Sequence, residues 1–289
     1  MEKVVTVILI LSLCLMPVQI QAKSVTSGTD DNGNKWTYNT STKTLTFTGN
    51  KAISDFAMNG HDREPSWYRW SDKTEHIVIE EGITGIGSEA FSSFTETKSI
   101  TMGESVKRIN RMAFWANVSL KEIKLSSNIT VIQGDALSGG RELETIKLPM
   151  RLRKMCSLSG QEKLEKIVMP DSITNMQSAM FSECKKLKYI KLPAKIREIK
   201  SYDFAGCKKL KKLTIPESVK TVSMSAFAGS GLKKIVLPEN VTTIKNGDAG
   251  RKVFQYIKGI NYPTKNLRVI EIHSKKVKSI QTVSYTHLR

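Results

Sequence analysis

The sequence has few of the residues that usually build catalytic or metal centres. Its 289 residues include four histidines, and no two of them stand at a metal-ligand spacing. It contains no His-Glu-x-x-His, Gly-x-Ser-x-Gly or Cys-x-x-Cys motif, and no glycine-rich phosphate loop before a helix. We therefore expect no metal site, no cofactor and no enzymatic activity.

Cysteine is also scarce. Cys14 lies in the amino-terminal apolar segment, so three cysteines remain beyond it, and this odd number argues against a fully paired disulfide framework. Cys156 has no general base near it in the sequence. A packed thiol is therefore favoured over a nucleophile at this position.

The first 22 residues differ from the rest of the chain. Lys3 precedes an apolar run from Val4 to Met16, and Ala22 offers a small residue for cleavage. The run is shorter than the roughly 20 apolar residues that span a bilayer, so residues 1–22 are predicted to be a secretory signal peptide. Lipid attachment at Cys14 is the alternative, although the residue before it is Leu13 and not a small one. Apart from this segment, no transmembrane span is expected.

Most of the remaining chain repeats one pattern of apolar residues. Taking Ile190 as position zero, the pattern restarts at Ile77, Ile100, Ile123, Ile146, Ile167, Leu213 and Ile235. Five of these seven intervals are 23 residues, and the others are 21 and 22. Self-similarity at such a period is the signature of a solenoid, in which each repeat forms one coil.

Aligning the repeats produces columns of similar residues. Position +6 is aliphatic in every repeat, and position +14 is Phe91, Phe114, Leu137, Phe181, Phe204 and Phe227. Proline occupies position +3 in five repeats, from Pro149 to Pro238, where it would end a strand at the same level of each coil. We expect a short strand at the start of each repeat, an extended segment at +6 to +9, and a helical or 3-10 turn at the Ala-Phe step.

The repeat resembles that of the BspA-like leucine-rich repeat proteins, L-x-x-I-x-L-P-x-S-V-x-x-I-x-x-x-A-F-x-x-C. The match is clear in Leu210 to Leu213, Ile215 to Val219 and Ala226-Phe227, and in the final cysteines Cys184 and Cys207. The resemblance implies an α/β solenoid dominated by β structure, with a parallel sheet and an amino-terminal β-hairpin cap. It also implies a secreted or cell-surface protein of bacterial origin with a role in adhesion.

Cys184 and Cys207 share one repeat position, so we expect them to stack on neighbouring coils about 5 Å apart. Two buried thiols are the favoured interpretation, because free cysteine behaves as a small apolar residue. A disulfide bond between them is the alternative.

Four regions follow from these patterns. Residues 1–22 form the signal peptide, 23–76 the amino-terminal cap, 77–281 the repeat solenoid, and 282–289 a tail without repeat pattern. That tail resembles translated adapter sequence, so the natural chain is expected to differ there. Within the cap, residues 23–34 are predicted to be flexible, and 35–48 to form a hairpin.

The longest departure from the template is an insertion at about 246–265. Insertions in solenoids become loops, often on the binding face, so this is a candidate binding loop. Its side chains suited to recognition are Arg251, Lys252, Tyr256 and Tyr262.

Four aromatic residues, Phe56, Trp67, Tyr68 and Trp70, precede the first repeat. A carbohydrate-stacking platform is one interpretation of such a cluster. The favoured interpretation is that these rings fill the end of the solenoid core.

The formal charge of +18 is concentrated in the repeats, because residues 101–289 hold 36 Lys and Arg against 15 Asp and Glu. Many of these lysines stand at −2, −1 and +1, of which −1 and +1 point away from the core. We call this predicted surface the lysine face. It comprises Lys124, Lys147, Lys166, Lys188, Tyr189, Lys191, Lys211, Lys212, Lys233 and Lys234.

The lysine face supports two interpretations. It can attract an anionic ligand, with Tyr189 as the anchor of a protein contact. Alternatively, the lysines only keep a long sheet soluble. We predict a non-catalytic binding scaffold whose partner is an extracellular protein or an anionic glycan, and we expect no nucleic acid. A polyanion-binding module is the second hypothesis and a glycan-processing enzyme the third. The sequence does not indicate an oligomeric state.

Overall fold

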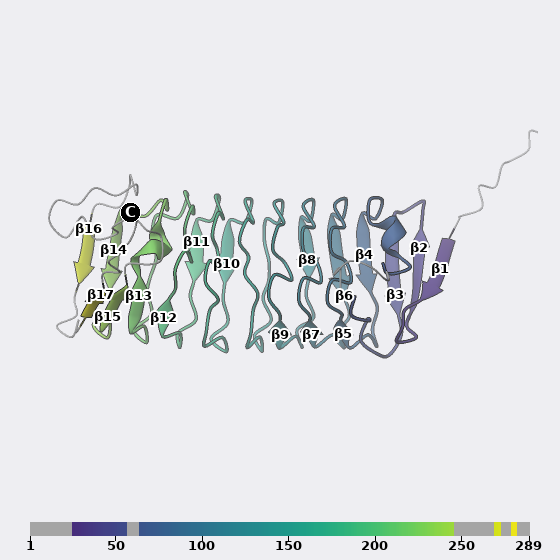
Figure 1. Cartoon of the computed structure of the whole chain (residues 1–289), viewed down its shortest axis with the longest axis horizontal. Helices are drawn as coiled ribbons and strands as arrows, with labels where there is room; N and C mark the ends of the chain where they lie inside the picture. Colours follow the sequence, from purple (N-terminus) through teal and green to yellow (C-terminus); the bar gives the residue numbers. More distant parts are fainter. Residues whose placement is uncertain (1–24, 57–63, 246–268, 273–278, 282–289) are drawn as a thin grey trace, which may run out of the picture.

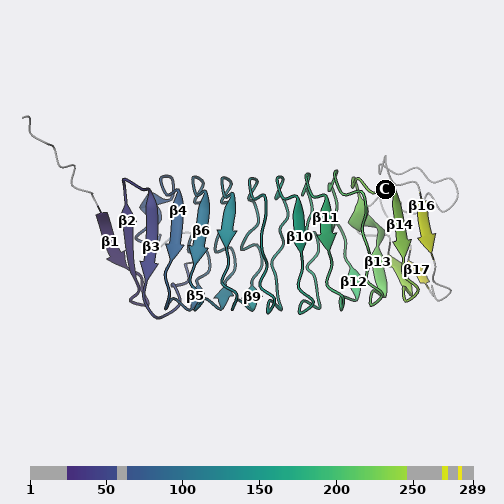
Figure 2. The ribbon, with the colours of Figure 1, turned by 180° about the vertical axis from the view of Figure 1, so that it is seen from behind.

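The structure is a computed structural model that describes residues 25–56, 64–245, 269–272 and 279–281. The chain winds into an elongated solenoid whose coils stack along one axis (Figure 1). The view from behind shows the same regular succession of coils (Figure 2). The predicted solenoid with parallel strands is therefore confirmed.

The first strand of a repeat lies on one side of the coil, here called the strand side. The segments at Ile146 and Leu213 are not strands, so the strand-side strands form three separate sheets. These strands are β4 (His76–Ile79), β6 (Ser99–Met102), β8 (Glu122–Lys124), β10 (Lys166–Val168), β11 (Tyr189–Lys191), β14 (Lys234–Leu237) and β16 (Val269–Ile272). They pair in parallel and in the predicted register, with Ile77 opposite Ile100 and Ile100 opposite Ile123. Ile235 is opposite Ile270, so the register continues beyond the predicted insertion.

The extended segments at +6 to +9 form shorter strands on a second side. They are β5 (Gly85–Ile86), β7 (Arg108–Ile109), β9 (Val131–Ile132), β12 (Glu198–Ile199), β13 (Thr221–Ser223), β15 (Thr243–Lys245) and β17 (Ser279–Gln281). In Figure 1 the labelled β5, β7 and β9 run along the lower edge of the body, below β4, β6 and β8.

The predicted apolar columns form the core. Phe181, Phe204 and Phe227 are fully buried and stack in sequence, with ring centroids 6.0 and 6.1 Å apart and planes within 10° of each other. Phe91 and Phe114 stack in the same way at 5.4 Å. The ring column is interrupted at Leu137 and in the coil that starts at Ile146, and on either side of this gap consecutive coils present phenylalanine at the same level.

Three segments without an assigned strand contain a residue that is not β-branched at the column position, whereas the segment at Ile146 keeps isoleucine and forms only an isolated bridge. The residue of this column is Ile or Val in every described coil that has a second-side strand, at +9 in six of them and as Ile280 at +10 in the last, but it is Met155 and Met176 in two consecutive coils that have none. On the strand side, Leu213 replaces isoleucine in a segment that is not a strand. Because β-branched side chains favour the extended backbone, these substitutions weaken strand formation locally.

The predicted helical turn at the Ala-Phe step is found once, as the 3-10 helix η2 (Met224–Phe227). In the other described coils the step is a tight turn between two residues of left-handed backbone. The first column of these residues is Glu89, Met112, Asp135, Ala179 and Tyr202, and the second includes Ser93, Ala116, Gly139, Glu183, Gly206 and Gly229. This turn is closed by a single i+3→i hydrogen bond, such as that from the Ser92 N–H to the Glu89 carbonyl at 3.1 Å, and the left-handed residues keep it from extending into a longer helix.

The amino-terminal region contains β1 (Val25–Thr29), β2 (Lys35–Asn39) and β3 (Thr44–Thr48). The predicted hairpin is present as the antiparallel pair β2–β3, and β3 pairs with the first repeat strand β4. That this hairpin acts as a cap stays a prediction. The prediction that residues 23–34 are flexible was wrong for the described part, because β1 pairs with β2 along its whole length.

The turn after β1 is organised by a buried carboxylate. Asp30 accepts hydrogen bonds from the backbone N–H groups of Asn32, Asn34 and Ser54 at 3.0, 2.8 and 3.1 Å. The polar residues that we took as a sign of flexibility therefore form an internal network, which a composition-based argument does not reveal.

The aromatic cluster fills the end of the core, as the favoured interpretation predicted. Trp67 is fully buried, and its ring makes edge contacts with Phe47 and Phe56 at 4.9 Å. Trp70, at the end of the 3-10 helix η1 (Tyr68–Trp70), stacks on Tyr38 at 4.3 Å. These contacts account for the rings through packing.

Cys156, Cys184 and Cys207 are buried free thiols, so the alternative of a disulfide bond is wrong. The Sγ atom of Cys184 donates to the Leu158 carbonyl and that of Cys207 to the Phe181 carbonyl, each on the preceding coil. Burial raises the pKa of Cys156 and of Cys207 to about 12. Because only a thiolate is a strong nucleophile, this environment keeps both thiols unreactive.

Candidate functional site

All ten residues of the lysine face are exposed, as predicted from the inward direction of positions zero and +2. The paired strands β10 and β11 place Lys166 opposite Tyr189 and Val168 opposite Lys191. The surface is therefore continuous across these two coils. The structure places these residues together, and their role in binding stays a prediction.

Part of the positive charge is balanced by acidic neighbours. The Nζ atom of Lys188 lies 2.8 Å from a carboxylate oxygen of Glu165, and Lys191 lies 4.0 Å from Asp171. The hydrogen bond from Lys188 is the main cause that lowers the pKa of Glu165. The lysine face is thus a mixed surface with a positive excess and not a uniform basic strip.

Apolar side chains lie between these lysines. Tyr189 is 50% exposed, and the outward valines Val168 and Val236 are 45% and 41% exposed. The sequence analysis missed both valines because it searched the outward columns only for charge and aromatic rings. Their +1 position would have identified them, since it is the same outward column that contains Lys191.

A groove of about 650 Å³ adjoins the amino-terminal end of the lysine face, lined by residues that include Lys124, Lys147 and Met150. Met150 is 76% exposed. Glu104 and Glu122 line the same groove, so its charge is mixed. An exposed thioether beside charges of both signs is suited to contact with another protein.

The candidate binding loop at about 246–265 lies outside the described residues. The structure therefore provides no test of Arg251, Lys252, Tyr256 and Tyr262 as binding residues. They remain a prediction from the sequence.

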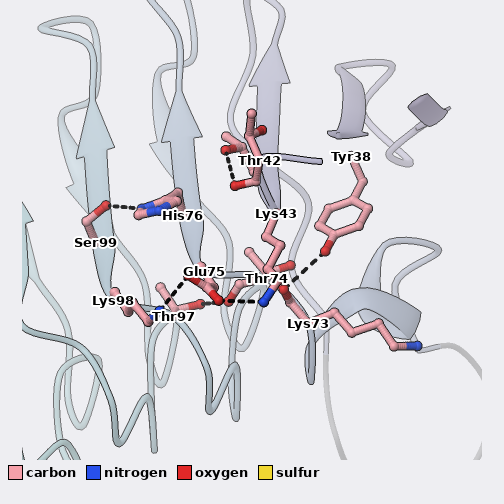
Figure 3. Close-up of polar contacts among 11 residues, drawn as sticks. Tyr38, Thr42, Lys43, Lys73, Thr74, Glu75, His76, Thr97, Lys98 and Ser99 are labelled. Carbon is pink, nitrogen blue, oxygen red and sulfur yellow. Dashed lines mark hydrogen bonds and ion pairs between the residues drawn. The ribbon is translucent and has the colours of Figure 1, made fainter. Parts of the chain in front are cut away.

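A network of polar contacts links the hairpin to the first two repeats (Figure 3). Glu75 accepts hydrogen bonds from the ammonium groups of Lys43 at 2.7 Å and Lys98 at 2.5 Å, so one carboxylate joins three successive coils. The hydrogen bonds from the two lysines lower the pKa of Glu75 to about 2. Thr97 donates to the backbone carbonyl of Thr74 in the same network.

The same network contains a serine beside a histidine. The Nδ1 atom of His76 lies 2.8 Å from the Ser99 hydroxyl, which is the distance of a nucleophile–base pair (Figure 3). Such a pair needs a third group to orient the base, but the adjacent carboxylate of Glu75 is bonded to Lys43 and Lys98. In the described residues we therefore interpret the pair as a contact between β4 and β6.

The described part of the chain has no group of three His, Cys, Asp or Glu side chains arranged to hold a metal ion. None of its helices has the length and apolar character that crossing a bilayer requires.

Solved structures with the same fold come from several bacteria. A leucine-rich repeat protein from Eubacterium ventriosum has a TM-score of 0.62 at 20% identity, covering 91% of this chain and 75% of its own. One from Bacteroides ovatus has a TM-score of 0.59 at 22% identity, covering 86% and 69%. The T. pallidum leucine rich repeat protein has a TM-score of 0.52 at 20% identity, covering 72% and 87%. At these identities the similarity shows the fold alone.

A comparison with proteins of curated function found no significant match. The sequence itself, however, matches a repeat family over most of its length. Residues 64–159 and 156–287 match the BspA type leucine rich repeat region, with six copies of the repeat. The chain therefore belongs to the BspA-type leucine-rich repeat family.

Proposed function

We propose that the chain is a secreted or cell-surface scaffold that binds other macromolecules and catalyses no reaction. The observation that carries this proposal is the lysine face, an exposed surface on which Tyr189, Val168 and Val236 accompany the lysines. Proteins built from such repeats are generally scaffolds, and stacked coils present an extended surface for binding. The burial of the thiols and the ion pairs of the Glu75 carboxylate with Lys43 and Lys98 also favour a non-catalytic role.

The chemistry of this surface favours a protein partner. Protein interfaces take most of their binding energy from a few aromatic and other large side chains, and charged groups around them set orientation and association rate. Tyr189 supplies the aromatic anchor, and it is exposed in the middle of the array. The family resemblance extends this proposal to adhesion, with a partner on a host or neighbouring cell.

Binding of a sulfated glycan through the lysines is the second candidate. The excess of lysine over acidic residues on the lysine face favours it. The two candidates differ in salt dependence, because attraction between exposed charges is screened at high ionic strength while apolar contact is not. Retention on immobilised heparin that disappears with salt would favour the glycan.

The experiment measures how many fluorescent beads attach to cultured epithelial cells when the beads are coated with the purified chain or with one of its variants. A variant carrying Val168→Ser, Tyr189→Ser and Val236→Ser should reduce attachment severalfold, because it removes the apolar anchors and leaves every charge in place. Its melting temperature should stay close to that of the unchanged chain, since the three side chains point outward.

The matched control changes two exposed apolar residues elsewhere, Val25→Ser on β1 and Trp115→Ser beside the phenylalanine column. They are 51% and 37% exposed. This control should attach normally. Equal attachment by all three proteins would contradict a protein-binding role for the lysine face, and attachment lost only on raising the salt would favour the glycan.

A further inference from the structure

The second side of the solenoid contains a basic groove at the point where its sheet is interrupted. β5, β7 and β9 form one sheet, and β12, β13, β15 and β17 form another. Residues 174–177 lie in the coil between them and belong to neither sheet. Before and after this coil, neighbouring coils are joined on the second side by backbone hydrogen bonds. Examples are the bonds from Arg153 N to Thr130 O and from Lys220 N to Arg197 O, both 2.8 Å.

This interruption opens a groove of about 770 Å³ across neighbouring coils. Its walls carry the side chains of Lys195, Arg197 and Lys220. All three are exposed, and Arg197 and Lys220 occupy the same column on consecutive coils. Adjacent strands are about 4.8 Å apart, so the two cationic groups can contact one extended anion together.

The groove is positively charged, because its one carboxylate is paired with a lysine. Its acidic member, Glu198, lies 2.8 Å from the ammonium of Lys245 and is therefore already neutralised. Within the described part of the chain, the three cations of the groove have no carboxylate within ion-pair distance. Their charges remain available to a ligand.

The other side chains in the groove identify the kind of anion. Thr174, Asn175 and Ser218 add hydroxyl and amide groups, and every residue that lines the groove is polar or charged. Protein interfaces usually bury aromatic or aliphatic anchors, which this groove lacks and the lysine face has. We propose that the second-side groove binds an acidic glycan, whose carboxylates or sulfates contact Arg197 and Lys220 and whose hydroxyls contact Thr174 and Asn175.

This proposal is independent of the lysine face, which lies on the other set of strands. The test measures binding of the purified chain to heparin octasaccharide, to oligogalacturonate and to poly-glutamate at physiological ionic strength. Changing Lys195, Arg197 and Lys220 together to Gln should weaken binding of both glycans about tenfold. A control with the same charge loss changes the exposed Lys186, Lys208 and Lys209 to Gln, and it should bind as the unchanged chain does.

A second variant separates glycan recognition from attraction between charges. Asn175→Ala leaves every charge in place, and it should weaken binding of the glycans while leaving that of poly-glutamate unchanged. The proposal would be overturned by equal loss in the groove variant and the control, by tighter binding of poly-glutamate than of either glycan, or by no glycan binding at all. Heparin binding that is lost only in a lysine-face variant would also overturn it.

Discussion

The ammonium group of Lys166 lies 5.4 Å from the centroid of the Tyr189 ring on the next strand. The strand register places the two residues opposite each other, so the contact follows from the repeat period. A cation over an exposed aromatic ring contributes about 0.5–1 kcal/mol. The pair therefore orders the Tyr189 ring while leaving half of its surface open to a partner.

The first prediction concerns the lysines of the lysine face. Changing Lys166, Lys191, Lys212 and Lys234 together to Gln should slow association with a cell-surface partner and flatten the salt dependence of binding. Each exposed charge contributes roughly 0–1 kcal/mol, so the single changes should have little effect. Association rates at two salt concentrations measure this, and the melting temperature should not move.

The control lysines must be free of ion pairs. Lys185 and Lys245 lie away from the lysine face, but they pair with Glu162 and Glu198 at 2.8 Å, so changing them would break contacts. Lys186, Lys208 and Lys209 are exposed and carry no such ion pair in the described residues. If their change to Gln slowed association as much, only net charge would matter.

The second prediction concerns the phenylalanine column. Phe204 stacks between Phe181 and Phe227 and is fully buried. Phe204→Ala should lower the free energy of unfolding by about 3–5 kcal/mol, because it leaves a cavity between two coils. Urea denaturation measures the loss. The control is Trp115→Ala, which changes a 37% exposed ring next to the column and should have a much smaller effect. Similar losses in the two variants would contradict the assignment of the phenylalanine column to the core.

The sequence predicted the parts of the fold that repeat. The columns, the register of Ile77, Ile100 and Ile123 and the outward direction of the lysines all follow from one period, since each coil must present the same faces to its neighbours. That residues 25–34 adopt an ordered structure could not be predicted, because this structure depends on long-range hydrogen bonds such as that from the Ser54 N–H to the Asp30 carboxylate.

The second-side groove was also absent from the predictions. It lies beside the segment that contains Met176, which forms no second-side strand, and no residue of this segment entered the predicted site. Met155 and Met176 are both buried, so the column is intact, but neither is β-branched. Apolar character decides which side chain is buried, whereas strand formation also depends on the shape of the side chain and on pairing with the neighbouring coils.

The third prediction concerns Glu75. The folded protein lowers its pKa from 4.5 to about 2 through the bonds from Lys43 and Lys98. The carboxylate therefore stabilises the fold above pH 4.5, and this contribution disappears as the pH falls toward 2. Glu75→Gln should melt at a lower temperature than the unchanged chain at pH 6, and the difference should shrink by pH 2.5. A constant difference across this range would contradict the assignment.

The fourth prediction concerns the interruption of the second-side sheet. Met176→Ile restores the β-branched residue found at this column in every coil that has a second-side strand. The change conserves side-chain volume, and it should slow hydrogen exchange of the backbone amides in residues 174–177 by favouring the extended backbone. Met176→Leu, which is not β-branched, is the matched control. Equal exchange in the two variants would show that the coil length, and not the residue, interrupts the sheet.

The fifth prediction concerns Asp203, which occupies the column position held by alanine in four other coils and is fully buried. Its carboxylate accepts hydrogen bonds from the N–H groups of Lys200 at 2.7 Å and Met180 at 3.4 Å. Burial nevertheless dominates and raises its pKa from 3.8 to about 7.

Because the folded protein holds this proton more tightly than the unfolded chain, Asp203 stabilises the fold when protonated. Stability should therefore fall as the pH rises from about 4 to about 7 and level off above, by on the order of 4 kcal/mol for the full shift. Asp203→Asn stays neutral, so its free energy of unfolding in urea should lack this decline. The difference between the two proteins isolates Asp203 from other titrating groups. Asp72→Asn, an exposed carboxylate, is the control, and a decline retained in Asp203→Asn would assign the pH dependence to another residue.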